Sequence, residues 1–461
     1  MTRHVPALVV GGGISGLVCA HALQKAGIEV LLAEASPRPG GVIHSITRDG
    51  FLLELGPQSF SVTLALRQLC EDLGVSDQVF QAPPRAPRYV LIDGQLRPVP
   101  LSPPAFFMSS LFNGSTKWSL VRDILGKSIP PDSDESVANF VRRKFSPQLL
   151  DRLVGPFVSG IYAGDPERLS FRSAFPQLYE AEKAAGSIIR GIMRPARSKQ
   201  GPRERPALQT FRDGNETLVR ALTAKLGTSL SCGTEVKAIQ CGGAGSGPRG
   251  LRFVVDVNSP AGDETLVVDN LILATPTNIT ARLLKGVDGA FESALGGIEY
   301  APVAVVSLGY RKLDVGHTLE GFGFLVPRSE GLRILGSVWN SSLFSGRAPK
   351  GHVLLTSFIG GASDPQAIFL SQEELVATVH KEINPVLDIR QCAVFSHVQI
   401  HPQAIPQYNL GHGERLASVA RERLPYSSLW LTGNYFRGPA IGTCVAQALT
   451  VAEEICKPSR H

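Results

Sequence analysis

A glycine-rich turn near the N-terminus is the first group of residues whose types and spacing could do chemistry. Gly11, Gly13 and Gly16 follow the apolar run 5–10 and precede an apolar stretch with helical spacing, 17–26. Between a strand and a helix, such glycines permit a tight turn, close approach of a pyrophosphate and close helix–strand packing. The residues expected to form this dinucleotide-binding turn are Gly11, Gly12, Gly13, Ile14, Ser15 and Gly16.

A carboxylate at the end of the next predicted strand strengthens this interpretation. Glu34 closes the apolar run 28–34, 18 residues after Gly16. This is close to the roughly 20-residue spacing at which a carboxylate binds ribose hydroxyls. The alternative is a surface glutamate beside an ordinary glycine turn, but the two features together favour a dinucleotide site.

Two further glycine-containing segments extend the predicted site. Arg38-Pro-Gly-Gly41 follows Glu34, and Glu54-Leu-Gly-Pro57 comes soon afterwards. They would place more backbone donors and one cation around phosphates, which a nicotinamide cofactor does not need and the longer flavin cofactor does. The alternative interpretation of these residues is a mobile turn.

These segments together resemble the flavoprotein amine-oxidase superfamily, which includes monoamine and polyamine oxidases, phytoene desaturases and porphyrinogen oxidases. Blocks at 155–170, 321–327, 405–412 and 431–441 are similar to one branch, the oxygen-dependent, FAD-containing porphyrinogen oxidases of haem synthesis. The resemblance extends from about residue 5 to 455. It implies a non-covalent FAD, because no cysteine stands before Pro439 where monoamine oxidases attach their flavin.

The resemblance assigns FAD contacts to several segments besides the glycine turn. They contain Glu34, Ala35, Arg38, Gly41, Val42, Gly56, Pro57, Gln58, Ser59, Val236, His401, Gly433, Pro439, Ala440 and Ile441. Val236 would contact the adenine, and the C-terminal residues would lie beside the phosphates and the isoalloxazine. For His401 a purely structural role is the alternative.

The resemblance also assigns a tetrapyrrole-binding site. Arg88 would bind a propionate, and Gly160 would leave room for a pyrrole ring. Leu325, Val338 and Phe358 would hold the macrocycle, in a slightly wider slot than in relatives that carry leucine at the position of Val338. The alternatives are a solvent-exposed arginine on a hairpin and ordinary core packing of the apolar residues.

The implied reaction needs no protein acid or base, and no catalytic residue is evident in the sequence. A methylene bridge of the substrate would deliver hydride to the flavin, and a pyrrole nitrogen would lose a proton. Three such rounds would remove six electrons, with oxygen reduced to hydrogen peroxide. Protoporphyrinogen and coproporphyrinogen both fit this chemistry, and the single evident propionate partner, Arg88, favours protoporphyrinogen.

Two rival functions stay open. An amine oxidase or desaturase belongs to the same superfamily, although we find no aromatic cage or flavin-facing lysine. A flavin-binding protein that hands porphyrin to a partner such as a metal chelatase would bind FAD without turnover.

Composition limits the remaining choices. The chain has 461 residues, 43% of them hydrophobic and 19% charged, which excludes a predominantly disordered protein. A net charge of +6 without a long basic run argues against nucleic acid. Seven dispersed cysteines argue against disulfides and zinc, so no metal is expected. With no signal peptide or long apolar span in the sequence, we expect a cytoplasmic protein.

The expected fold class is α/β, with a discontinuous Rossmann-like FAD-binding domain of the p-hydroxybenzoate-hydroxylase type. We assign 1–80, 207–280 and 410–461 to this domain, 281–409 to a mixed β-sheet substrate domain, and 81–206, including a hairpin at 88–97, to a mainly helical insertion.

The helical insertion has an apolar stretch and a basic loop that could contact a membrane. The apolar residues are Phe106, Phe107, Met108, Leu111 and Phe112, and the loop spans 190–205. They predict peripheral contact with the inner face of the cell membrane. A dimer interface, which would make a homodimer, is the alternative.

Overall fold

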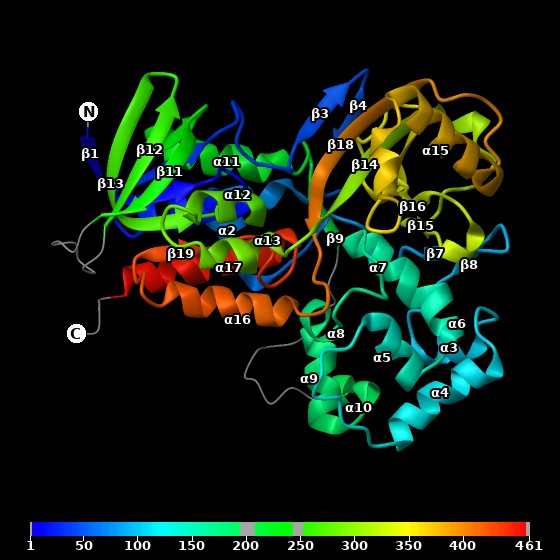
Figure 1. Ribbon diagram of the computed structural model, residues 1–461. Helices are drawn as coiled ribbons and strands as arrows, with labels where there is room; N and C mark the ends of the chain where they lie inside the picture. The colour runs from blue at the N-terminus through cyan, green and yellow to red at the C-terminus, as the bar shows by residue number, and fades with distance from the viewer. Residues whose placement is uncertain (1, 194–207, 243–251, 458–461) are drawn as a thin grey trace.

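A seven-stranded sheet carries the N-terminal turn (Figure 1). The structure, a computed structural model, describes residues 2–193, 208–242 and 252–457. In spatial order the strands are β10 (Leu230–Cys232), β2 (Val30–Glu34), β1 (Thr2–Val10), β13 (Gly262–Leu273), β12 (Phe253–Ser259) and β11 (Glu235–Cys241), with β19 (Leu429–Leu431) also paired to β13. Because β1 is parallel to β2 and β13, and β13 is parallel to β19, the carboxyl ends of these four strands meet at one edge.

The strands of this sheet differ in one place from those the sequence predicts. In the sequence, the runs 265–269 and 271–276 on either side of Asn270 predict two separate strands. The structure has a single strand, β13, because Asn270 keeps its pairing with Ala7 of β1. The prediction of a break there was wrong.

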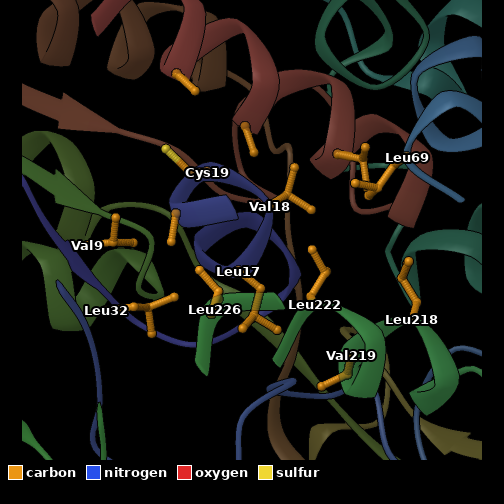
Figure 2. Close-up of a cluster of buried hydrophobic side chains, with 14 of the residues drawn as sticks. Val9, Leu17, Val18, Cys19, Leu32, Leu69, Leu218, Val219, Leu222 and Leu226 are labelled. Carbon is orange, nitrogen blue, oxygen red and sulfur yellow. The ribbon is translucent and has the colours of Figure 1, made fainter. Parts of the chain in front are cut away.

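Helices cover both faces of this first sheet. One face carries α1 (Ile14–Lys25), α2 (Leu64–Leu73), α11 (Glu216–Leu226) and α17 (Ile441–Cys456), and the other carries α12 (Thr277–Leu284), α13 (Ala290–Gly296) and α16 (His412–Arg423). Side chains alternate along a strand, so Ala7 and Val9 point toward α1 and Leu8 points the other way. Figure 2 shows Leu17 of α1 in this core beside Leu226 of α11. Burial of this core fixes the glycine turn between β1 and α1.

A second seven-stranded sheet lies beside the first sheet and its helices (Figure 1). Its order is β18 (Phe395–Pro406), β14 (Tyr300–Arg311), β17 (His352–Gly360), β16 (Ile334–Val338), β15 (Gly323–Leu325), β7 (Arg88–Ile92) and β8 (Gln95–Pro98). The helix α15 (Gln372–Leu387) covers one face, where Leu375 and Val379 pack on Val306 and Leu355. The opposite face of this sheet, which carries Val305 and Leu335, points away from α15.

The hairpin β7–β8 corrects the predicted division of the chain. Its turn at Asp93 and Gly94 lies where the sequence indicates. We assigned it to the helical insertion, but β7 pairs in parallel with β15 and completes the second sheet. The helices that follow it form a separate group below that sheet in Figure 1.

This helical group has its own core. Its helices are α3 (Pro103–Met108), α4 (Gly114–Leu125), α5 (Val137–Lys144), α6 (Pro147–Leu149), α7 (Gly155–Tyr162), α8 (Phe171–Ala174), α9 (Pro176–Ala185) and α10 (Ile188–Met193). Phe140 and Phe171 stack at 3.6 Å between ring centroids at its centre. Lys144 reaches a carboxylate oxygen of Asp123 at 2.6 Å, so these two buried charges are paired.

The apolar stretch of this group is only partly exposed. Phe106, Leu111 and Phe112 are buried in the helical core, whereas Phe107 and Met108 are exposed. Of the basic loop, Arg190 donates to backbone carbonyls, including that of Ile124, and the positions 194–205 lie outside the described residues. In the part of the chain that the structure describes, no helix has the length and apolar character needed to cross a bilayer.

Candidate functional site

The glycine turn joins β1 to α1 at the carboxyl edge of the first sheet. Gly11 has a φ of +102°, a conformation that favours glycine. A Cβ atom on Gly16 would lie 1.9 Å from the carbonyl oxygen of Gly11, whereas one on Gly13 would meet no atom within 4 Å. Ile14 and Ser15 open α1 and contribute its first N–H groups. The turn is therefore tightly packed at Gly16 and has open space at Gly13.

Glu34 lies over this turn. Its carboxylate accepts hydrogen bonds from the N–H of Gly12 at 2.5 Å and from the N–H of Ser36 at 2.8 Å. Thr234 donates its N–H to the carbonyl of Glu34, which brings the start of β11, with the buried Val236, beside Ala35 and the end of β2. A carboxylate and an apolar strand thus lie together next to the turn.

The loop that follows β2 closes over the turn from the other side. Gly13 and Gly40 form an isolated parallel bridge. The guanidinium of Arg38 donates to the carbonyls of Gly41 at 2.7 Å and Ile43 at 3.0 Å. These donors shape the loop, and the contact of the Arg38 cation with the phosphates stays a prediction.

The segment 54–59 supports this loop. It follows β4 (Phe51–Glu54), the partner of β3 (Ser45–Arg48). A Cβ atom on Gly56 would lie 2.0 Å from the carbonyl oxygen of Val42. Only glycine at position 56 therefore lets the segment approach the loop this closely. Gln58 is buried, and its Nε2 donates to the carbonyls of Glu54 at 2.8 Å and Gly56 at 3.0 Å. The Gln58 amide therefore fixes the backbone of the segment that contains Pro57 and Ser59.

The C-terminal segment brings a second helix start to the same edge. Gly433 follows β19, and α17 begins at Ile441 with Ala440 as its N-cap and Pro439 before it. Because α17 packs along α1 and both follow parallel strands, their positive ends open at one edge. Burial raises the pKa of the nearby Cys444 thiol to about 11, so this cysteine is protonated at neutral pH.

One face of the second sheet brings together the predicted apolar residues. Leu325 of β15 pairs with Gly336 of β16, which in turn pairs with Phe358 of β17. Residues paired across neighbouring strands share a face, so Leu325 and Phe358 flank the glycine. Gly336 carried no signal of a site in the sequence, since a single glycine within a strand is equally typical of a bulge or a bend.

Arg88 lies in the next row of the same face. It pairs with Gly323, and Gly323 pairs with Val338. The guanidinium of Arg88 is exposed and lies 5.6 Å from the centroid of the Phe322 ring. Among the described residues no carboxylate pairs with it, so its charge is available to a ligand.

The helix α7 lies against this face. A Cβ atom on Gly160 would lie 2.5 Å from Cδ2 of Leu325. Phe157 and Ile161 lie three residues before and one after Gly160, on the same side of the helix, and each is 43% exposed. These two residues were not predicted from the sequence. Their apolar character and partial exposure next to Gly160 are typical of a wall that receives an apolar ligand.

His401 connects the second sheet to the first part. Its Nε2 lies 2.7 Å from the carbonyl oxygen of Leu55, directly before Gly56. A carbonyl accepts, so this nitrogen carries the proton. His401 therefore has a structural contact and lies beside the segment 54–59.

Two buried polar contacts across the same boundary had no signal in the sequence. Arg347 and Glu54 form an ion pair at 3.0 Å, with side chains only 2% exposed. Asn340 donates to Oε1 of Gln58 at 2.7 Å. The partners are separated by 293 and 282 residues, so local patterns could not reveal them.

Comparison with known proteins agrees with this arrangement. The model of the flavin containing amine oxidoreductase family matches residues 14–456. The chain is 35% identical to the chloroplastic protoporphyrinogen oxidase of Nicotiana tabacum over 97% of this chain and 85% of that protein. It is 30% identical to the coproporphyrinogen III oxidase of Bacillus subtilis (strain 168), over 96% of each chain.

The fold also matches solved structures. A crystal structure of a protein from Exiguobacterium sp. 255-15 superposes with a TM-score of 0.81 at 24% identity, covering 99% of each chain. The family match spans nearly the whole sequence and both parts of the site. The chain therefore belongs to the flavin-containing amine oxidoreductases.

Proposed function

We propose that this protein oxidises protoporphyrinogen IX to protoporphyrin IX, with three molecules of oxygen reduced to hydrogen peroxide. One observation carries the proposal: Arg88, Leu325, Val338 and Phe358 share one sheet face, with Gly160 directly against Leu325. An apolar wall with one free guanidinium suits an apolar macrocycle that bears propionates. Relatives named protoporphyrinogen oxidase at 31–36% identity support the same choice.

The cofactor we propose is FAD, bound without a covalent link. The residues fit it: the open space above Gly13, the carboxylate of Glu34 and the two helix starts suit an adenosine and a pyrophosphate. Cys444 is buried and protonated, which supports non-covalent binding. When bound, FAD supplies the hydride acceptor that no side chain provides.

The protein's own residues would bind and orient the substrate. Arg88 would hold a propionate, while Leu325 and Phe358 would set the plane of the macrocycle against α7. Because no acid or base is required of the protein, alignment of the reacting carbon supplies the rate enhancement. Coproporphyrinogen III, which carries two more propionates, is the second candidate, since the Bacillus subtilis relative bears that name.

We further propose a cytoplasmic enzyme that contacts the membrane through its helical group. Phe107, Met108 and Trp118 are exposed on α3 and α4 by 41, 80 and 64%. Insertion of such side chains into a lipid interface is favourable. A homodimer through this surface is the competing arrangement, and hand-over of product to a metal chelatase would suit either. Sedimentation with anionic vesicles, carried out on the unmodified protein and on Met108→Lys, separates membrane contact from dimerisation.

An aerobic assay tests the proposed reaction. Purified, FAD-loaded protein is given protoporphyrinogen and coproporphyrinogen in parallel, and porphyrin fluorescence and peroxide are followed. We expect faster fluorescence growth with protoporphyrinogen, and a loss of rate in Arg88→Ala. Preference for coproporphyrinogen would select the second candidate. A rate no greater than spontaneous oxidation with both substrates would reject the function.

A further inference from the structure

The boundary between the two walls of the proposed site contains a bridging side chain. The segment 54–59 supports the flavin loop through Gly56, and β16 carries the substrate-facing Val338. Asn340 is two residues after Val338 and opens the short helix α14 (Asn340–Leu343). Its side chain, 4% exposed, donates to Gln58. A single side chain thus spans the two walls.

The Gln58 amide has no freedom left once Asn340 binds it. Its Nε2 is shared between two carbonyls of its own segment, and its Oε1 accepts from Nδ2 of Asn340 at 2.7 Å. An amide that is held at both ends transmits the position of one partner to the other. The backbone of Gly56 therefore follows the position of Asn340.

The connection from Asn340 back to Val338 is equally rigid. Trp339 lies between them with no exposed surface, and its backbone N–H donates to the carbonyl of Phe322 at 3.0 Å. Two residues of such a backbone leave little room for independent motion. The substrate wall and the flavin segment are therefore joined by a short chain of fixed groups.

The Asn340 side chain has one buried polar atom without a hydrogen-bond partner among the described residues. This atom is Oδ1. A buried unpaired acceptor is unfavourable, so the Oδ1 atom does not account for an asparagine at this position. A requirement to reach Gln58 does account for it.

A second contact runs parallel to the first. Arg347, in the loop after α14, pairs with Glu54 at 3.0 Å, and its guanidinium also donates to the carbonyl of Phe211 at 3.1 Å. Asn215 donates its side chain to the carbonyl of Pro57 at 2.8 Å. Both ends of the segment 54–59 are thus held from outside, and Asn340 is the side chain that connects it to the residues directly after the substrate wall.

We infer that Asn340 is a positioning residue, which sets the distance between the substrate-binding wall at Val338 and the flavin segment through Gln58. The inference rests on the proposed function for its substrate, but the contact itself does not. Its role is distinct from binding, because Asn340 faces Gln58 and is separated from the macrocycle wall by Trp339.

The test compares Asn340→Ala with Ser341→Ala in FAD-loaded protein. Ser341 is the next residue of α14, and its hydroxyl accepts from the N–H of Leu354, so it is a matched control that keeps the contact between Asn340 and Gln58. Under anaerobic conditions, we expect Asn340→Ala to slow reduction of the flavin by porphyrinogen about tenfold. In the aerobic assay, the KM for porphyrinogen should change less than about twofold. Ser341→Ala should match the unmodified protein.

A double-mutant cycle and a substrate-free readout complete the design. The variant with both Gln58→Ala and Asn340→Ala should reduce its flavin no more slowly than Gln58→Ala alone, because both substitutions remove the same contact. Visible circular dichroism of the bound flavin should differ from the unmodified protein in Asn340→Ala but not in Ser341→Ala. An unchanged reduction rate in Asn340→Ala, additive effects of the two substitutions, or a dichroism spectrum identical in all variants would overturn the inference. Failure of both porphyrinogens with the unmodified protein would reject the proposed function alone, because the dichroism still tests the contact.

Discussion

A Cβ atom on Gly160 would lie 2.5 Å from Cδ2 of Leu325, so the absence of a side chain on α7 is what lets the helix approach β15. The atom that would be displaced is the far end of a flexible side chain rather than backbone. Leu325 would therefore have to move, and we expect this movement to narrow the space for the proposed substrate. The two residues set the width of the slot together.

Gly160→Ala is expected to raise the KM for porphyrinogen about three- to tenfold, with the melting temperature changed by less than about 2 °C, because Leu325 moves rather than the backbone. Steady-state kinetics and thermal unfolding measure both quantities. Gly289→Ala, where a Cβ atom meets nothing within 4 Å, is the control. A KM in Gly160→Ala equal to that of the unmodified protein would show that the substrate does not bind between α7 and β15.

Arg88→Ala should weaken substrate binding by about 10- to 100-fold, as expected for the loss of a hydrogen-bonded charge pair. Arg88→Lys should retain part of the affinity, because the charge stays and the planar fork is lost. The measurement is the KM together with FAD content, which should not change. Equal KM values for Arg88→Ala and the unmodified protein would remove Arg88 from the site.

The glycine turn offers a contrast between packing and ligand contact. Gly16→Ala would force a Cβ atom to 1.9 Å from a backbone oxygen, so both FAD binding and folding of the first sheet should fail. Gly13→Ala has open space, so the protein without FAD should keep its melting temperature while its affinity for FAD falls at least about tenfold. Thermal unfolding with and without added FAD separates the two effects. Normal FAD affinity in Gly13→Ala would contradict the proposed pyrophosphate position.

Loss of one partner of the buried ion pair between Arg347 and Glu54 should destabilise the fold more than loss of one partner of an exposed pair. Burial lowers the pKa of Arg347 and raises that of Glu54. Removing one partner leaves an uncompensated charge, so Arg347→Ala should lower the free energy of unfolding by about 3–5 kcal/mol. Arg311→Ala, which removes the exposed pair with Asp314, should cost at most about 1 kcal/mol. Urea unfolding of both variants gives the comparison, and similar values would show that burial is not decisive here.

Acidic pH should destabilise the protein partly through His412. Burial lowers the pKa of His412 from 6.5 to about 4 in the folded protein, and its Nε2 lies 2.9 Å from the carbonyl oxygen of Tyr435. The unfolded chain takes up the proton first, so stability is complete above pH 6.5 and falls as the pH drops toward 4, by on the order of 3 kcal/mol.

The measurement is the urea midpoint at several pH values. His44 and His397 have pKa values lowered in the same direction, so the His412 share is the difference from His412→Gln. An identical pH dependence in that variant would rule out His412.

The sequence predicts the structure well where a local pattern determines it. The glycine turn and Glu34 stand at the ends of adjacent parallel strands because a short βαβ unit has few alternatives. Prediction failed where partners are distant. The hairpin β7–β8 was recognised, but its neighbour β15 is a three-residue strand with no pattern of its own. The contacts of Arg347 and Asn340 depend on packing of two sheets, which no spacing along the chain records.

The position of β19 and α17 has a consequence for biosynthesis. β13 is completed on one side by a strand from residues 429–431, and the second helix start comes only at Ile441. During translation, the first sheet therefore waits for nearly the entire chain to leave the ribosome. A nascent protein stalled before these residues would expose the apolar faces of β13 and α1 that α17 covers in the complete fold.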